Sequence, residues 1–338
     1  MSDTRLQQLL DWAGPHAGRL GLRLDTVRAA SDDASFRRYF RIDSTDPGRA
    51  SVIAMDAPPP HEDVRAFLHA GAVLAAAGLR VPAVLARDEA AGFLLLDDFG
   101  STTYLDALDA ASAPALYADA SAALVRLQAA SRPGVLPGYD RELLARELDL
   151  FPAWYVERHR GVALDDAERA GLAGVFDALL ANNLAQPRVF VHRDYHSRNL
   201  MRLPGASNPG VLDFQDAVHG PITYDLVSLL RDAYIDWDEA QVIDWAVRHW
   251  QRARAASLPL ATDFGEFWRD FEWMGLQRHL KVLGIFARLS HRDGKHRYLA
   301  DLPRVLAYVE RAARRYGAMA PLARLLDRVE QRRVGYTF

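Results

Sequence analysis

Two polar segments, each placed after a short apolar run, constrain the fold of this chain more than any other feature. The first reads His-Arg-Asp-Tyr-His-Ser-Arg-Asn over residues 192–199, and the second reads Asp-Phe-Gln over residues 213–215. Because of the apolar runs, we expect buried strands over residues 188–192 and 211–214. Each polar segment then begins at a strand end, which would place carboxylate and amide side chains near one another.

The first segment contains His-Arg-Asp-x-x-x-x-Asn, a pattern that resembles the catalytic loop of the protein-kinase-like fold. Asp213 follows Asp194 by nineteen residues, where such kinases place Asp-Phe-Gly. The resemblance implies that Asp194 orients an attacking hydroxyl and accepts its proton, and that Asn199 and Asp213 bind Mg²⁺ at the phosphates of ATP. His192 would hold the loop backbone by hydrogen bonds. Taken alone, the first pattern is also compatible with a polar turn after a buried strand.

The apolar periodicity divides the chain into a β-rich first part and an α-rich second part. In the first part we expect a helix that ends before Gly14-Pro15, a second helix at residues 62–77, and strands at residues 37–42, 51–55, 81–85 and 92–96. In the second part, helices are expected at residues 113–127, 141–158, 165–181, 224–234, 239–255, 264–289 and 302–316. We therefore predict an α+β, bilobal protein-kinase-like fold, with a nucleotide-binding lobe over residues 1–98 and a catalytic and acceptor-binding lobe over residues 99–338.

The first lobe departs from the kinase pattern because it contains no lysine. The only lysines are Lys281 and Lys295, so a Walker-type phosphate loop is excluded, and Met55 stands where the nucleotide-binding lysine is expected. The loop over residues 31–36 lacks glycine, although its backbone N–H groups could still bind phosphate. The residues that we assign to nucleotide binding are Ser35, Phe36, Arg38, Arg41 and Asp98.

Two alternatives stay open for these residues. Strand alternation puts Arg37 and Arg41 on one face and Arg38 on the other, and either face could simply be solvated. Asp98 follows the expected hinge strand, where backbone groups would meet adenine, but it could equally cap the next helix. A lobe without its lysine could also belong to a nucleotide-binding pseudokinase scaffold, against which the intact catalytic pattern argues.

The residues after Asp213 favour a small-molecule kinase over a protein kinase. The next helical pattern begins at Tyr224, which leaves no room for an activation segment, and no Ala-Pro-Glu follows. The run Asp-x-x-x-x-x-x-Gly-Pro-x-x-x-Asp-Leu over residues 213–226 resembles the aminoglycoside-phosphotransferase and choline-kinase-like superfamily, whose members phosphorylate small molecules. In that pattern Asp225 is a structural residue that starts a helix and braces a loop.

The second part also carries candidates for acceptor binding. Six cations but only one acid, Asp293, lie between residues 276 and 297, which favours an acidic acceptor over a polycationic drug. A solvated basic helix face is the alternative. Aromatic rings with charged neighbours after residue 230 suit a sugar, although Trp237 could be a core residue. The residues that we assign to substrate binding are Arg231, Tyr234, Trp237 and Arg278.

Four longer runs, over residues 34–41, 192–201, 212–217 and 275–288, resemble the bacterial anomeric kinases of N-acetylmuramate and N-acetylglucosamine. The resemblance covers nearly the whole chain. It implies ATP-dependent phosphorylation of the C1 hydroxyl of an amino sugar, in peptidoglycan recycling toward UDP-N-acetylmuramate. An aminoglycoside-, choline- or homoserine-type kinase is the alternative within the superfamily.

The composition sets the remaining expectations. The chain contains no cysteine, which excludes disulfides, thiolate metal sites and cysteine nucleophiles. Its net charge of −3 gives no reason to expect a nucleic-acid partner. It has no signal-peptide pattern and no run of the ~18 apolar residues that a membrane span requires. We expect a cytoplasmic monomer whose ligands are ATP, Mg²⁺ and a small amino sugar, with no nucleic-acid or membrane partner.

Overall fold

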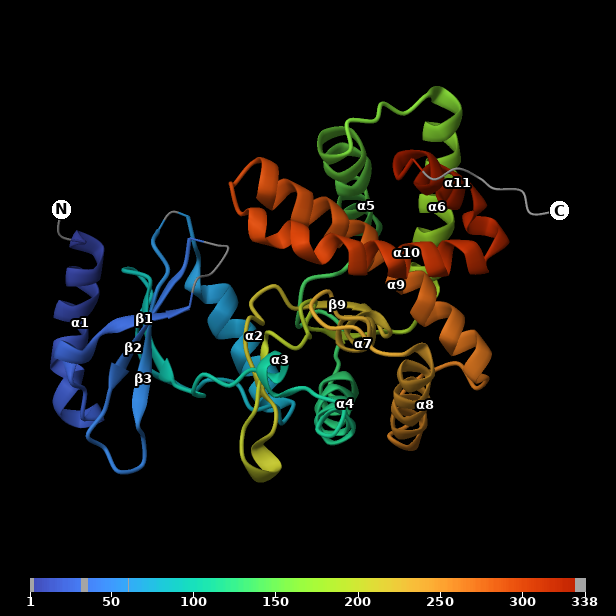
Figure 1. The fold of residues 1–338 in the computed structure, drawn as a ribbon. Helices are drawn as coiled ribbons and strands as arrows, with labels where there is room; N and C mark the ends of the chain where they lie inside the picture. Colours follow the sequence, from blue (N-terminus) through green and yellow to red (C-terminus); the bar gives the residue numbers. More distant parts are fainter. Residues whose placement is uncertain (1–2, 32–35, 60, 332–338) are drawn as a thin grey trace. The chain divides into compact units, whose positions relative to one another are not determined.

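The computed structural model describes residues 3–31, 36–59 and 61–331, which fold into two compact units (Figure 1). The first unit consists of Met1–Thr103 and Leu200–Asp216, and the second of Tyr104–Asn199 and Ala217–Phe338. Asp213 therefore lies in the first unit, whereas Asp194 and Asn199 lie in the second. The predicted assignment of nucleotide binding to residues 1–98 and of acceptor binding to residues 99–338 stays a prediction.

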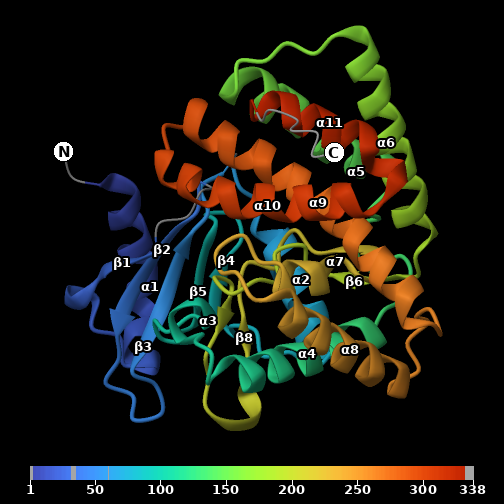
Figure 2. The same cartoon turned by 45° about the vertical axis from the view of Figure 1, so that its right-hand side comes forward.

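The first unit is built on an antiparallel sheet with the strand order β1-β2-β3-β5-β4 (Figure 2). Its strands are β1 (Arg28–Ser31), β2 (Arg38–Asp43), β3 (Ser51–Asp56), β4 (Val84–Asp88) and β5 (Phe93–Asp97). Helices α1 (Thr4–Leu20) and α2 (Val64–Ala76) belong to the same unit, as does the short hairpin of β7 (Leu200–Met201) and β8 (Gly210–Val211). Helix α1 packs on the sheet through Leu9 and Ala13, which share a core with Ile42, Val52 and Phe93.

The expected end of the first helix before Gly14-Pro15 is wrong, because α1 continues through Pro15 to Leu20. Proline removes a backbone N–H donor, but the buried side chains of Leu9, Ala13 and Leu20 continue the packed face on both sides of it. Gly21 caps the end of the helix, and its φ of 64° lies in the left-handed region that favours glycine. Tertiary packing therefore outweighs the local Gly-Pro signal.

The second unit is mainly helical. It contains α3 (Tyr104–Ala107), α4 (Ala113–Ala129), α5 (Arg141–Leu148), α6 (Asp166–Ala185), α7 (Tyr224–Leu230), α8 (Glu239–Ala255), α9 (Phe264–His291), α10 (Leu302–Arg315) and α11 (Ala320–Val329). Strands β6 (Arg188–Val191) and β9 (Val218–Pro221) pair in an antiparallel ribbon. Short 3₁₀ turns in the two units lie at Leu24–Thr26, Gly205–Ser207, His296–Asp301 and Gly317–Met319. Within the described ranges, no helix is both long and apolar enough to span a membrane.

Helix α9 is the central element of the second unit, and most of its side chains between Phe267 and Ala287 are buried. It lies beside α10 (Figure 2) and packs closely on the segment that follows α5. The helix expected over residues 141–158 divides there into α5 and a π-helical segment, Phe151–His159. Pro152 cannot donate a backbone hydrogen bond, and Gly284 of α9 approaches so closely that a Cβ would lie 2.5 Å from the carbonyl of Leu150.

Candidate active site

The loop after β6 is held by a carboxylate beneath it. Asp225, in the first turn of α7, is fully buried and accepts the backbone N–H of His192 at 2.6 Å and that of Arg193 at 2.9 Å. Arg193 has a φ of 77°, a left-handed conformation that is uncommon for arginine, so this turn needs such support. The buried ring of His192 accepts the backbone N–H of Asp194 through Nδ1 at 3.2 Å. His192 and Asp225 therefore both support the loop backbone.

Asp194 and Asn199 are brought together by this loop. The side-chain nitrogen of Asn199 donates to the carbonyl oxygen of Asp194 at 3.0 Å, and its backbone N–H donates to His196 at 2.9 Å. Burial alone would raise the pKa of the Asp194 carboxyl, but the charges of Lys281, His196, Arg278 and Arg193 together lower it below its usual value. Asp194 is therefore ionised at neutral pH, as a proton acceptor must be.

A buried ion network lies under the same loop. Glu147 of α5 accepts hydrogen bonds from Lys281 at 2.9 Å and from Arg193 at 2.5 Å, and the Tyr139 hydroxyl donates to the same carboxylate. Lys281 also donates to the Tyr224 hydroxyl at 3.1 Å. The sequence assignments did not include Glu147 or Lys281. Lys281 lies in the run over residues 275–288 that resembles the anomeric kinases. That resemblance is the sequence signal that could have pointed to Lys281.

Two of the four residues assigned to the acceptor have polar or aromatic groups close to the loop. Tyr234 packs edge-on against His196, with ring centroids 5.4 Å apart, and its ring also receives the guanidinium of Arg198 at 4.2 Å. Arg278 is 3% exposed, and its charge acts on both Asp194 and His196. Tyr234 and Arg278 therefore lie near the loop that carries Asp194, and their contact with an acceptor stays a prediction.

The other two acceptor assignments have partners inside the protein. Arg231 is 2% exposed, and its Nη2 lies 3.0 Å from the fully buried carboxylate of Glu272. Its guanidinium also stacks on the rings of Trp268 and Phe271. Trp237 donates through Nε1 to the Tyr117 hydroxyl at 2.7 Å. The side chains of Arg231 and Trp237 therefore have partners within the second unit. These contacts do not favour the predicted contact of either residue with a sugar.

In the first unit, Asp213 lies in a charged cluster that includes an arginine missing from the nucleotide assignments. Asp213 Oδ1 accepts a hydrogen bond from Gln215 at 2.8 Å and lies 3.7 Å from Nη2 of Arg37. Nε of the same arginine lies 3.8 Å from Glu62 Oε2. Met55, at the expected lysine position, is fully buried. Arg37 precedes β2, so strand alternation does not govern its direction, contrary to our expectation for residues 37–42.

Arg38, Arg41 and Asp98, which we assign to nucleotide binding, form ion pairs within the first unit. Arg38 forms ion pairs with Asp56 at 2.7 Å and with Asp3, and Arg41 donates to Asp98 at 2.9 Å. Asp98 also accepts the hydroxyl of Ser51 and the backbone N–H of Gly100, so its carboxylate braces the segment after β5. Phe36 is 65% exposed and stacks on His61. Ser35 lies outside the described residues. Contact of these five residues with a nucleotide stays a prediction.

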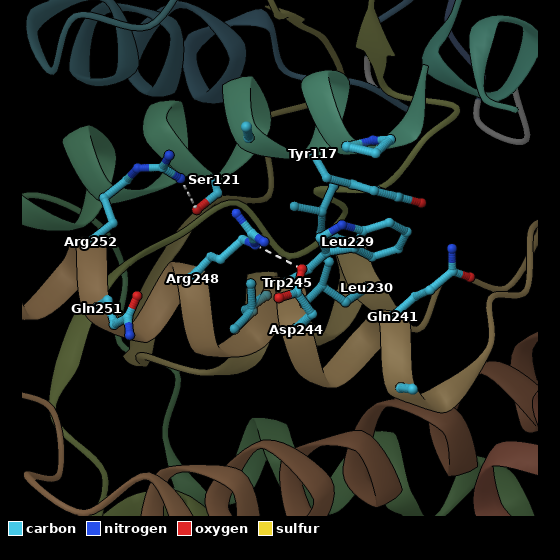
Figure 3. Close-up of a pocket in the computed structure, with 14 residues that line it drawn as sticks. Tyr117, Ser121, Leu229, Leu230, Gln241, Asp244, Trp245, Arg248, Gln251 and Arg252 are labelled. Atoms are coloured by element: carbon cyan, nitrogen blue, oxygen red, sulfur yellow. Dashed lines mark hydrogen bonds and ion pairs between the residues drawn. The ribbon is translucent and has the colours of Figure 1, made fainter. Parts of the chain in front are cut away.

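The second unit also contains a pocket of about 830 Å³ between α4, α7 and α8 (Figure 3). Its lining includes Tyr117 and Trp245, and its charged groups pair among themselves or with neighbours. Arg248 donates to Asp244 at 2.7 Å, and Arg252 donates to Ser121 at 2.8 Å (Figure 3). The lining of this pocket includes none of Asp194, Asn199 and Arg278. It is therefore separate from the candidate active site.

The predicted metal ligands are Asn199, in the second unit, and Asp213, in the first, and their binding of a metal ion stays a prediction. Their amide and carboxylate oxygens are the hard ligands that Mg²⁺ prefers. The hydrogen bond from Asn199 to the Asp194 carbonyl engages the amide nitrogen, so the amide oxygen is the atom with ligand chemistry. Within the part of the chain that the structure describes, no cluster of three or more His, Cys, Asp or Glu side chains forms a metal site. An all-protein cage of the zinc type is therefore not present there.

Comparison with known proteins decides the family. A model of the phosphotransferase enzyme family matches residues 26–260, which is more than half of the chain. The chain belongs to this family. Two relatives extend the match: an N-acetylmuramate/N-acetylglucosamine kinase of Pseudomonas putida is 47% identical over 335 residues, and the alignment covers 97% of each chain. A kinase of the same name from Pseudomonas aeruginosa is 50% identical, with 89% of this phosphotransferase and 88% of the relative covered.

Solved structures confirm the predicted fold class. The choline kinase LicA from Streptococcus pneumoniae has a TM-score of 0.62 and 12% identity, and the match covers 88% of this phosphotransferase and 97% of LicA. The ADP-bound aminoglycoside phosphotransferase APH(2'')-Ib has a TM-score of 0.59 and 13% identity. The match covers 91% of this phosphotransferase and 98% of that structure. The small antiparallel sheet and the larger helical unit are thus those of the protein-kinase-like fold.

Proposed function

We propose that this phosphotransferase transfers the γ-phosphoryl group of ATP to the anomeric C1 hydroxyl of N-acetylmuramate and N-acetylglucosamine, in peptidoglycan recycling toward UDP-N-acetylmuramate. The observation that carries the proposal is that relatives 47% and 50% identical over most of the chain share the name N-acetylmuramate/N-acetylglucosamine kinase. The geometry around Asp194 supports a reaction in which a hydroxyl is activated.

The proposed reaction assigns Asp194 the central role. The ionised carboxylate would orient the C1 hydroxyl and accept its proton as the oxygen attacks the γ-phosphorus. The new bond joins the sugar oxygen to phosphorus, and the bond between phosphorus and the β,γ-bridging oxygen breaks, which releases ADP. The hydrogen bonds that Asp225 accepts hold the loop backbone, so Asp194 presents its carboxylate from a fixed position.

Mg²⁺ is the cofactor that fits the proposed roles of Asn199 and Asp213. When bound, it would neutralise charge on the phosphates of ATP. The phosphates also need a cation from the first unit, where no lysine is present. Arg37 is the best candidate, because its guanidinium lies near both Glu62 and Asp213. Arginine can bind phosphate oxygens in a bidentate manner, so it can replace lysine in this role with a different geometry.

Two other functions stay as alternatives: an aminoglycoside-, choline- or homoserine-type kinase, and a nucleotide-binding scaffold without turnover. We also propose that the protein is a monomer and lies in the cytoplasm. The ionised state of Asp194 and the support of its loop argue for turnover. The cationic stretch around Arg278 argues against a polycationic acceptor, because its charge would repel such a substrate.

The test is an acceptor panel with product analysis. The purified protein is incubated with ATP, Mg²⁺ and each of N-acetylmuramate, N-acetylglucosamine, kanamycin, choline and homoserine, and ADP release is measured. Phosphorus NMR then locates the phosphate on the product through its coupling to the anomeric proton. We expect turnover with the two amino sugars and a C1 phosphate. Turnover with another acceptor alone, or a phosphate at C6, would contradict the proposal, and ATP binding without turnover would indicate the scaffold.

A further inference from the structure

We propose that Arg278, together with the ring of His196, forms an anion-binding subsite beside Asp194 that recognises the carboxylate of an acidic acceptor. This inference rests on the proposed function and deepens it. At C3, N-acetylmuramate carries a lactyl ether that ends in a carboxylate, whereas N-acetylglucosamine carries a hydroxyl there. The subsite would therefore act on one of the two sugars and not on the other.

The polar side chains beside Arg278 on α9 are bonded within the protein, apart from the amide oxygen of Gln277. Gln277 donates to the carbonyl of Leu144 at 2.9 Å, the His279 ring bonds to the carbonyl of Arg231 at 2.9 Å, and Lys281 pairs with Glu147. Arg278 is as buried as these residues, yet its Nη1 has no hydrogen-bond partner among the described residues. A buried guanidinium nitrogen without an acceptor is costly, which indicates that an acceptor atom comes from a ligand.

Two further buried polar atoms occur on the loop next to Asp194. His196 is 8% exposed and Ser197 is 1% exposed, and neither Nδ1 of His196 nor Oγ of Ser197 has a partner among the described residues. The backbone N–H of His196 donates to the carbonyl of Asp194 at 3.0 Å, and the ring of Tyr234 packs against His196. The charge of Arg278 acts on both His196 and Asp194. Groups that can bind a ligand are thus gathered around the proposed base.

The chemistry of these groups fits a carboxylate. A guanidinium presents parallel N–H donors that match the two oxygens of a carboxylate. The ring of His196 can add a hydrogen bond through Nδ1, which has no partner among the described residues. Asp194 does not need Arg278 as its only counter-charge, because Lys281 and Arg193 also act on it. One positive charge therefore remains for one negative group of the acceptor.

The experiment compares two acceptors in one variant. Arg278→Met is assayed for kcat/KM with N-acetylmuramate and with N-acetylglucosamine at saturating ATP, and Arg288→Met serves as the control because it removes the same charge from the same helix. Loss of a charged hydrogen bond predicts a fall of about 10- to 100-fold for N-acetylmuramate, mainly in KM. N-acetylglucosamine should change by less than about 3-fold, and Arg278→Lys should be intermediate with N-acetylmuramate. An equal fall for both sugars, or no fall for either, would overturn the inference.

A second measurement uses the unmodified protein, so it does not depend on whether the variant folds. The primary amide of N-acetylmuramate is nearly isosteric with the acid but carries no charge. The subsite predicts that the amide has a KM about 10- to 100-fold above that of the acid. Equal KM values would overturn the inference even if both sugars are good substrates. If the unmodified protein phosphorylates neither amino sugar, the proposed function itself fails, which is a distinguishable result.

Discussion

The carboxylate of Asp213 and the guanidinium of Arg37 lie 3.7 Å apart in the first unit, which contains no lysine. The same guanidinium lies 3.8 Å from Glu62, and its side chain is only 10% exposed. In the usual arrangement a lysine from the third strand pairs with a glutamate of the following helix. Here Met55 is buried on β3, and the guanidinium of Arg37, from before β2, lies near Glu62, which precedes α2.

Arg37→Ala should therefore weaken ATP binding. Because a charge-assisted hydrogen bond to phosphate would be lost, we expect KM for ATP to rise by about 10- to 100-fold, while Arg37→Lys should recover part of the affinity. Steady-state kinetics at saturating acceptor measures this change. Arg28→Ala is the matched control, since Arg28 lies on the same sheet and pairs with the exposed Asp43. An unchanged KM for ATP in Arg37→Ala would show that metal and backbone hold the phosphates.

Lys281→Met should shift the pH dependence of the reaction. Burial tends to raise the pKa of Asp194, and Lys281 is the foremost of the charges that lower it below its usual value. The base must be ionised, so kcat/KM falls as the pH drops through the pKa of Asp194. Removing the positive charge raises that pKa, and the acid limb of the pH profile should move upward by about one pH unit.

The conservative variant Lys281→Arg keeps the charge next to Glu147 and should keep the acid limb near its original position. A lower kcat at every pH in Lys281→Met, without any movement of the acid limb, would show that Lys281 only packs the loop. Measuring kcat/KM over the range in which the protein stays folded distinguishes these results.

Buried histidines should make the fold sensitive to acid. Burial, with a contribution from the charge of Arg252, lowers the pKa of His249 to about 3, and its Nδ1 bonds to the Ser121 hydroxyl at 2.9 Å. An unfolded chain takes up this proton near pH 6.5, but the folded chain does so only near pH 3. Folding free energy is therefore lost as the pH falls through this window, by up to about 1.4 kcal/mol per pH unit for one group.

His249→Asn removes this proton and keeps an acceptor for Ser121, so the dependence of unfolding free energy on pH should become shallower between pH 6.5 and 3. Denaturant unfolding at several pH values measures the slope. His69→Asn, a substitution at an exposed position of α2, is the control. An identical slope in His249→Asn and in the unmodified protein would mean that His249 is not kept neutral by burial.

Much of the fold could be predicted from local pattern. The bounds of α8 agree with the expected helix over residues 239–255, because its apolar spacing and its Asp238 cap are both local signals. The errors occur where distant residues decide. Pro15 stays helical because α1 packs on the sheet, and the expected helix over residues 141–158 divides where Gly284, more than a hundred residues away, allows α9 to approach.

The site shows the same division between local and distant information. The loop pattern identified Asp194 and Asn199 together, because both lie within one turn-rich segment. It could not identify the cation near Asp213, since the choice among Arg37, Arg38 and Arg41 depends on which acidic partner each one meets in space. For the same reason Arg231 was assigned to the acceptor, although Glu272, forty-one residues later, pairs with it inside the second unit.

Asp194→Asn gives the most direct test of the account, because the proposed chemistry depends on one carboxylate. The amide is nearly isosteric but cannot accept the proton of the C1 hydroxyl, so kcat for N-acetylglucosamine should fall by about 10²- to 10⁴-fold. The melting temperature and KM for ATP should stay close to those of the unmodified protein. A folded Asp194→Asn variant that keeps kcat within about 3-fold would contradict the assignment of the active site.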